Sequence, residues 1–366
     1  MSLSPPASDS FDPVDYARAL ILRYGRNSTA YQILNHGFSR WFAPTEEGMV
    51  GYVRRRKVAV VAGDPVCAEE RVEEITRQFE EYVEDNRMNR VCWFCARSEF
   101  ASRFENRKGY DTILIGAQPV WNPNGWKDKI ETHPSLRAQL HRARNKGVTV
   151  QEWPVRKGNN HPELQRCLRE WLDSRPFPPL HFLVEPQTLD RLFDRRLFVA
   201  EREGVVTGFV LLSPVPCRNG WLVEQFVRGK NAPNGTIELA LHHAITTIAK
   251  EGYTYVTLGL APLSQRAGLA GSNPRIIRFL FGWLRLHGRR FYKFEGLDSF
   301  KAKFFPDYWE PIWAVSNERR FSLRTLYAVA SAFSDGLLFR PLLLALMKAL
   351  HQEGRWLALQ LRSRRD

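Results

Sequence analysis

Residues 223–263 read VEQFVRGKNAPNGTIELALHHAITTIAKEGYTYVTLGLAPL and combine a strand, a glycine-containing turn, a helix and a second strand. Short apolar runs bounded by turn residues predict the two strands, and apolar residues at a helical period between 235 and 250 predict the helix. A strand, a helix and a strand in immediate succession are typical of a sheet covered by helices. This segment therefore predicts an α/β fold.

Polar residues gather at the strand ends within this segment. They are Glu224, Gln225, Arg228, Asn234, Gly235 and Thr236. Free backbone N–H groups at a helix start can bind a phosphate or a carbonyl oxygen, and the glycine permits a close approach. The arginine adds a fork of donors that suits phosphate. Because active sites of α/β folds collect at strand ends, we predict a site here.

The elements along the rest of the chain follow a repeated order. A hairpin is predicted at 49–53 and 57–62, a helix from 69 and strands at 90–95 and 111–117; in the second half a hairpin is predicted at 196–201 and 205–213, a strand at 221–227, a helix at 235–250 and a strand at 253–258. This order predicts a duplicated mixed α/β unit. The expected organisation is a flexible start at 1–22, domains at 23–153 and 154–316, and a basic amphipathic helical tail at 317–366.

Composition places the chain among ordinary globular proteins. Its 366 residues suffice for two domains, and 44% of them are hydrophobic and 25% charged. The polar start lacks the order of a secretory signal, and no run approaches the roughly 18 apolar residues of a spanning helix, so we expect a cytoplasmic protein. The net charge of +14 attracts polyanions such as nucleic acid or anionic lipid headgroups.

The cysteines and histidines indicate neither a disulfide framework nor a metal site. The five cysteines are an odd number scattered over a long chain. Cys92 and Cys95 form a C-x-x-C, but they lie within VCWFCA, which predicts a buried strand, and no second ligand pair accompanies them. His242 and His243 lie in the middle of a predicted helix. We therefore expect structural roles for these residues and no bound metal.

Three basic segments are candidates for contact with phosphates. A helix that begins near Ser135 carries Arg137 and Arg144 on one side. Residues 275–290 hold five arginines and no acid, and they form either a core helix with solvated arginines or a face that lies on the phosphates of RNA or lipid. The apolar segments 326–332 and 337–347 of the tail fit either helices in a membrane interface or helices that dock on protein.

Several short motifs together resemble one known family. In chain order they are GDPV at 63–66, SLR at 135–137, WL at 171–172, RP at 175–176, APNGT at 232–236, LGLAPL at 258–263, FYKFEGL at 291–297, FKAKF at 300–304 and WEP at 309–311. They cover roughly residues 20 to 315 in one order, which makes the set far more specific than any single motif. The chain resembles the C-terminal domain of the phosphatidylglycerol lysyltransferases.

This resemblance implies a tandem GNAT-like (acyl-CoA N-acyltransferase-like) fold, with mixed sheets flanked by helices and a transfer site in the second domain. The site would receive aminoacyl-tRNA on one side and a membrane lipid such as phosphatidylglycerol on the other, without a further cofactor. The protein would then act peripherally at the inner face of the membrane. Because an aminoacyl ester is already activated, the enzyme need only orient a lipid hydroxyl against its carbonyl carbon.

The resemblance and the residue types also suggest roles for single side chains. Glu224 is the candidate general base, and the alternative is a buried carboxylate that bonds a neighbouring loop. Backbone N–H groups of residues 234–236 would receive the developing oxyanion. Lys301 and Lys303 would hold a phosphate, and the alternative is an exposed helical face. The expected catalytic residues are Glu224, Gln225 and Arg228, and the expected substrate contacts are Asn234, Gly235, Thr236, Glu238, Lys301, Lys303, Arg137 and Arg144.

Two features depart from the pattern of the family. Many relatives place an Asp three residues before the Arg, where this chain has Gln225, so Glu224 must supply any carboxylate. The sequence contains no multi-span translocase domain of the kind that precedes the enzyme in full-length members, so we expect it to make the product without moving it across a bilayer. Two other functions stay open: a CoA-dependent N-acyltransferase, and a non-catalytic module that holds tRNA or an anionic membrane.

Overall fold

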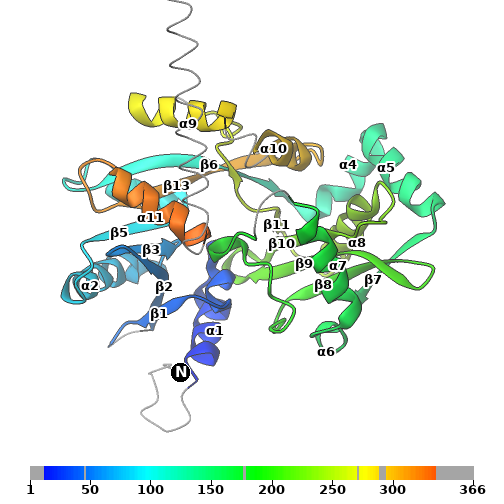
Figure 1. Cartoon of the computed structure of the whole chain (residues 1–366), viewed down its shortest axis with the longest axis horizontal. Coiled ribbons are helices and arrows are strands. Elements are labelled where there is room, and N and C mark those ends of the chain that lie inside the picture. Colours follow the sequence, from blue (N-terminus) through cyan, green and yellow to red (C-terminus); the bar gives the residue numbers. More distant parts are fainter. Residues whose placement is uncertain (1–11, 45–46, 176–178, 270–271, 288–293, 335–366) are drawn as a thin grey trace, which may run out of the picture.

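The computed structural model describes residues 12–44, 47–175, 179–269, 272–287 and 294–334. A continuous mixed sheet runs through them, with helices packed along it in two halves (Figure 1). The strand order is β1-β2-β3-β5-β13-β6-β11-β10-β9-β8-β7, while β4 pairs with β2 and β12 pairs with β6. The predicted α/β class is confirmed.

The longest strands are β6 and β9, with 11 residues each, and β6 and the three-residue β11 meet where the two halves join. The strands are β1 (Ser39–Phe42), β2 (Gly48–Arg55), β3 (Val58–Ala62), β4 (Val66–Cys67), β5 (Arg90–Ala96), β6 (Asp111–Trp121), β7 (Val148–Trp153), β8 (Arg196–Arg202), β9 (Val205–Val215), β10 (Gly220–Arg228), β11 (Tyr255–Thr257), β12 (Ala261–Pro262) and β13 (Tyr308–Ser316). The helices are α1 (Pro13–Tyr24), α2 (Val72–Asp85), α3 (Ser98–Ala101), α4 (Trp126–Thr132), α5 (Pro134–Asn145), α6 (Val155–Gly158), α7 (Pro162–Asp173), α8 (Thr236–Lys250), α9 (Arg275–His287), α10 (Phe294–Ala302) and α11 (Leu323–Phe333).

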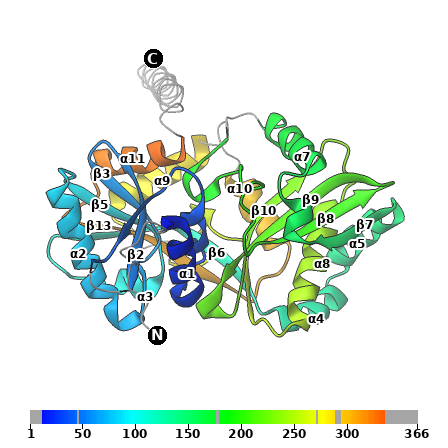
Figure 2. The same ribbon diagram turned by 90° about the horizontal axis from the view of Figure 1, so that it is seen from below.

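The two halves share one local topology. In the first, β2 and β3 are antiparallel, and α2 leads from β3 to the parallel strand β5. In the second, β9 and β10 are antiparallel, and α8 leads from β10 to the parallel strand β11. β6 joins the halves because it pairs with β13 on one side and with β11 on the other (Figure 2). The repeated order predicted from the sequence is therefore present as repeated strand pairing.

The sheet pairing does not follow the boundaries 23–153 and 154–316. β7, which was assigned to the first domain, pairs with β8 at the far edge of the second half. β13, which was assigned to the second domain, lies between β5 and β6 in the first half. These corrections concern long-range pairing, which local sequence patterns do not report.

The two ends of the described chain are held against the sheet. Residues 13–22, which were expected to be flexible, belong to α1, and Ala17, Leu20 and Ile21 in this helix are buried. Proline at the first position and the Asp12 side chain, which accepts from the Val14 N–H at 2.7 Å, start the helix. At the other end α11 packs on β2, β3 and β5, so segment 326–332 docks on the protein itself. Segment 337–347 lies outside the described residues.

Local predictions for the core of each half hold. β5 contains the buried Cys92 and Cys95, both with free thiols, as expected for a structural strand. α8 directs Ile237, Leu241 and Ile245 into an apolar cluster under the second half of the sheet. Two tryptophans from the β6–α4 region complete that cluster. The helical period of the sequence therefore identified the buried face of α8 correctly.

Candidate functional site

The strands β10 and β11 pair over only part of their length. Their shared register covers Gly220–Leu222 opposite Tyr255–Thr257 and then stops. On its other side, β10 has an irregularity in the register with β9 between Val223 and Gln225, so that Glu224 is the extra residue. Bulges of this kind bend a strand and redirect a side chain, and they are common beside active sites. We call the part of the sheet beyond Leu222, where β10 and β11 no longer pair, the β10–β11 opening.

The bulge directs Glu224 into a buried ion pair. Its two carboxylate oxygens accept from Nε and Nη2 of Arg195 at 2.7 and 3.0 Å, and the two side chains are 3% and 0% exposed. Arg195 also donates to the side chain of Asn35 and lies over the ring of Tyr31, both from the first half. This geometry corresponds to the alternative interpretation of Glu224, a buried carboxylate that bonds a neighbouring segment, and both oxygens are already engaged.

The neighbouring predicted residues stabilise local turns. Gln225 is buried and donates to the backbone oxygens of Glu185 and Pro186. Arg228 donates to the Ala232 oxygen at 2.8 Å and to the Asn234 side chain at 3.0 Å, which closes the turn before α8. These contacts hold the loops on both sides of β10.

Gly235 is required by packing between helices. Its φ angle is +92°, and a Cβ atom there would lie 2.2 Å from the backbone oxygen of Gln139 on α5. The Thr236 hydroxyl donates to the Pro233 oxygen at 2.8 Å, and Thr236 is completely buried. The glycine that the sequence suggested for approach of a substrate therefore permits the approach of α5 instead.

The helix α10 occupies the β10–β11 opening. Phe300 stacks on Phe226 of β10 with ring centroids 5.1 Å apart, and Phe304 joins the apolar cluster beneath α8. Lys303 forms an ion pair with Glu238 in the first turn of α8 at 2.5 Å. The structure thus brings together the predicted residues Glu238, Lys301 and Lys303 around one helix, although Glu238 and Lys303 neutralise each other.

Lys301 is the most unusual of these side chains. It is 3% exposed, and its Nζ donates to the backbone oxygens of Gly259 and Leu260, each at 2.8 Å. Burial lowers the pKa of its ammonium group to about 7, although the Asp298 carboxylate opposes this shift. Neither interpretation from the sequence describes it, because it is not an exposed helical residue and it is too deeply buried to hold a phosphate.

A match to a known protein family covers most of the chain. Residues 18–316 match the family described as phosphatidylglycerol lysyltransferase, C-terminal. The chain belongs to this family. The resemblance inferred from the motifs is thereby confirmed.

The relatives of this lysyltransferase-family chain are distant in sequence. It is 21% identical to the phosphatidylglycerol lysyltransferase of Staphylococcus epidermidis over 83% of this chain and 36% of the relative. It is 27% identical to the lysylphosphatidylglycerol biosynthesis bifunctional protein LysX of Nocardia farcinica over 82% of this chain and 26% of the relative. The chain therefore spans about a third of the length of the curated relatives that it matches.

Two solved structures share the fold of this family member. One is the C-terminal domain (DUF2156) of a putative lysylphosphatidylglycerol synthetase from Agrobacterium fabrum, with a TM-score of 0.73, 22% identity, and coverage of 88% of this chain and 98% of that chain. The other is L-PGS from Bacillus licheniformis, with a TM-score of 0.71, 19% identity, and coverage of 91% and 97%. At these identities the likeness shows the fold alone.

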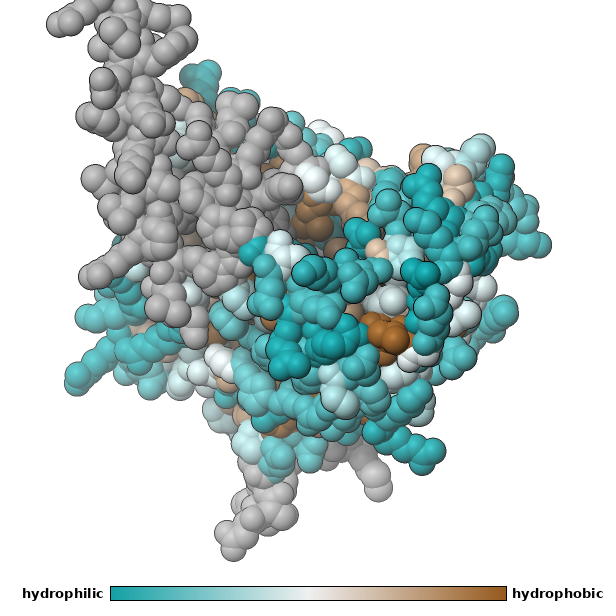
Figure 3. Space-filling view, turned by 45° about the vertical axis from the view of Figure 1, so that its right-hand side comes forward, coloured by the Kyte–Doolittle hydropathy of each residue, from teal (hydrophilic) through white to brown (hydrophobic). Residues whose placement is uncertain are grey.

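In this lysyltransferase-family chain, the two predicted arginines of α5 separate. Arg137 is half-buried and donates to the backbone oxygens of Ile130 and Glu131 at the end of α4, so it joins the two helices. Arg144 is exposed, as are Arg142 and Lys146, and no ion pair within the described residues engages these three side chains. Because α5 packs on α8, this cationic group lies beside the candidate site. The corresponding face of the molecule is predominantly hydrophilic (Figure 3).

Several residues around Lys301 were not predicted from the sequence. The Ser264 hydroxyl donates to Asp298 at 2.6 Å, and Arg266 donates to the other oxygen of the same carboxylate at 2.6 Å. Phe226 and Phe300 were not among the predicted site residues. Their meeting depends on α10 entering the β10–β11 opening, and no local pattern in the sequence signals this contact.

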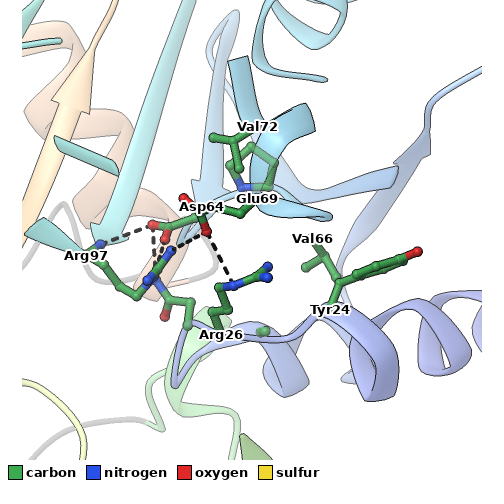
Figure 4. A pocket seen from close by; sticks show the side chains of 10 residues that line it. Tyr24, Arg26, Asp64, Val66, Glu69, Val72 and Arg97 are labelled. Atoms are coloured by element: carbon green, nitrogen blue, oxygen red, sulfur yellow. Dashed lines mark hydrogen bonds and ion pairs between the residues drawn. The ribbon is translucent and has the colours of Figure 1, made fainter. Parts of the chain in front are cut away.

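A small pocket lies elsewhere, in the first half of this family member. Asp64 of the GDPV turn accepts from Arg97 Nε at 2.6 Å and from the Arg97 backbone N–H at 3.0 Å (Figure 4). Tyr24, Arg26 and Glu69 also line this pocket. Its volume of about 10 Å³ suits a single water molecule. The Asp64 carboxylate thus holds the turn to Arg97, which indicates a structural role for the turn.

The described residues contain neither a metal cluster nor a membrane-spanning helix. Within the part of the chain that the structure describes, no three His, Cys, Asp or Glu side chains are arranged to hold a metal ion. No helix there combines the length and the apolar character needed to cross a bilayer.

Proposed function

We propose that this chain transfers an aminoacyl group from aminoacyl-tRNA to a membrane lipid such as phosphatidylglycerol. The observation that carries the proposal is the family match over residues 18–316. The curated relatives are named for lysylation of phosphatidylglycerol, and this chain aligns with about a third of their length. The protein would act in the cytoplasm, at the inner face of the membrane.

The reaction needs no cofactor, because both bonds that change belong to the substrates. The lipid hydroxyl oxygen forms a bond to the carbonyl carbon of the aminoacyl ester, and the bond from that carbon to the ribose oxygen of tRNA breaks. The lipid hydroxyl loses a proton and the ribose oxygen gains one. The protein therefore has to orient the two substrates, stabilise the oxyanion and pass on one proton.

Lys301 is the group that we propose accepts this proton. In the neutral amine, two N–H groups still satisfy the oxygens of Gly259 and Leu260, while the lone pair occupies the third position on Nζ. A pKa of about 7 leaves a large fraction of the amine neutral at physiological pH. Glu224 cannot share this role while both of its oxygens accept from Arg195. Because Phe300 stacks on Phe226 one residue before Lys301, the Phe300 side chain must move aside for the substrates to reach the amine while α10 stays in place.

The proposed function is tested by supplying both substrates to the full chain. The protein is mixed with tRNA charged with a labelled amino acid and with phosphatidylglycerol vesicles, for lysine first and then for other amino acids. We expect label in the organic phase as an aminoacylated lipid. Label that appears only as free amino acid would contradict the proposal. Consumption of acetyl-CoA, with no transfer from tRNA, would favour a CoA-dependent acyltransferase instead.

The exposed cations of α5 are expected to bind the tRNA. Reversing them in the variant Arg142→Glu/Arg144→Glu/Lys146→Glu should raise the KM for aminoacyl-tRNA by at least about tenfold and reduce its dependence on salt, because each phosphate contact releases counterions. The matched control is Lys57→Glu/Arg87→Glu/Lys108→Glu, which reverses three exposed charges in the first half. An equal effect of both variants would show that only net charge matters and would remove α5 as the RNA-binding face.

A further inference from the structure

The outer side of α9 exposes large apolar side chains. Ile276 and Phe279 are each 76% exposed, and Leu269, just before the helix, is 42% exposed. Eight large apolar side chains are exposed in the described residues, and three of the eight lie between positions 269 and 279. Solitary exposed apolar residues are ordinary, whereas a group of them on one element marks a contact surface. We call Leu269, Ile276 and Phe279, together with Arg275 and Arg278, the α9 face.

One side of α9 packs on the core of the first half. On its inner side Ile277 is buried in the core cluster of the first half, and Phe281 packs against the same cluster. The Asn273 side chain before the helix exchanges two hydrogen bonds with the backbone of Leu114, at 2.7 and 2.8 Å. The helix therefore has a packed inner side, and Ile276 and Phe279, three residues apart, lie on the opposite side of the helix.

The charges on the α9 face have one sign. Arg275 and Arg278 are exposed, and within the described part of the chain no hydrogen bond or ion pair engages either side chain. The helix sequence RIIRFLFGWLRLH contains three arginines and no acid. Apolar side chains alternating with unpaired arginines match a membrane interface, where phosphates lie directly above acyl chains. An RNA backbone would satisfy the arginines but would leave the isoleucine in water.

The position of α9 relates it to the candidate site. Arg285 near the end of the helix donates to the backbone oxygen of Leu263 at 2.7 Å. Leu263 follows β12, and the preceding residues Gly259 and Leu260 accept from Lys301. α9 and α10 lie side by side over the sheet in both views (Figures 1 and 2). A lipid held at the α9 face would therefore lie next to the entrance to the β10–β11 opening.

We propose that the α9 face docks on an anionic membrane surface. Ile276, Phe279 and Leu269 enter the boundary between headgroups and acyl chains, while Arg275 and Arg278 bind lipid phosphates. This inference rests on the proposed function, because it presents a membrane lipid to the same site. Beyond the proposed function, it identifies the surface that contacts the bilayer. In this orientation α10 faces the lipid headgroups.

Co-sedimentation of the full chain with vesicles tests the α9 face. We expect binding to vesicles made of phosphatidylglycerol and phosphatidylcholine in equal parts, and little binding to phosphatidylcholine alone. Ile276→Ser/Phe279→Ser should weaken binding to the anionic vesicles by at least about tenfold. Arg275→Gln/Arg278→Gln should weaken it and flatten its salt dependence. Val205→Ser, which changes a residue 49% exposed at a hairpin in the second half, is the matched control and should bind like the wild type.

Three results would overturn the inference. They are unchanged vesicle binding by Ile276→Ser/Phe279→Ser, a dimer in light scattering that this variant abolishes, and loss of tRNA binding without loss of vesicle binding. All variants change exposed residues, so circular dichroism should show that they remain folded. Transfer by the wild type to a short-chain phosphatidylglycerol below its micelle concentration is measured separately. If that transfer fails while the α9 variant still loses vesicle binding, the proposed function falls and the docking face remains.

Discussion

Glu224→Ala is expected to lower the free energy of unfolding by about 3–5 kcal/mol. The substitution leaves the guanidinium of Arg195, whose side chain is completely buried, without its carboxylate partner. A buried charge without a partner costs much more than the pair itself contributes, because the charge has lost its hydration. Urea denaturation of the wild type and the variant measures the change. Loss of activity in Glu224→Ala alone would therefore not distinguish a loss of folded protein from the loss of a catalytic group.

Two companion variants separate these explanations. Arg195→Met/Glu224→Leu removes both charges and should recover most of the lost stability, since an apolar pair needs no compensation. Glu81→Ala removes an exposed ion pair with Arg77 and should change stability little. If Glu224→Ala is as stable as the wild type but transfers no aminoacyl group, Glu224 acts on the substrate and our structural assignment is wrong.

Lys301→Met is expected to reduce the rate of transfer by about 10²–10⁴-fold, the usual contribution of a general base. Methionine fills a similar volume, but its side chain has no nitrogen that could accept a proton. It also has no N–H donors for the backbone oxygens of Gly259 and Leu260. In the wild type the rate should rise with pH through the pKa of about 7 as the neutral amine forms, and then level off. The remaining rate of Lys301→Met should lack this inflection. Initial rates measured across the pH range check both statements.

The pH dependence of the free energy of unfolding provides a test of Lys301 that does not depend on activity. The pKa of Lys301 falls from 10.5 to about 7 on folding, so between these values the unfolded chain binds more protons than the folded one. Stability of the wild type should therefore rise with pH across this window, and Lys301→Met should lack that rise. Lys303→Met, which breaks the ion pair with Glu238, should keep both the rise and the inflection in rate. An unchanged pH profile in Lys301→Met would refute the role of Lys301.

Local features of this protein could be predicted from the sequence. The strand β10, the helix α8 and its buried face, and the hairpin of β2 and β3 all follow from apolar periods and turn residues. The family could be inferred as well, because its motifs occur in one order along the chain. Each of these properties depends on neighbours within a few residues or on the order of short segments.

The tertiary structure decided which distant groups meet. Glu224 is paired with Arg195, 29 residues away, and Gly235 lies against Gln139 of α5. β13 and β7 joined halves of the sheet other than those assigned to them. Lys301 acquired a pKa near neutrality because α10 buries it in the β10–β11 opening. Burial and the pairing of charges depend on packing between segments far apart in the chain, and a pattern read along the sequence carries no record of those distances.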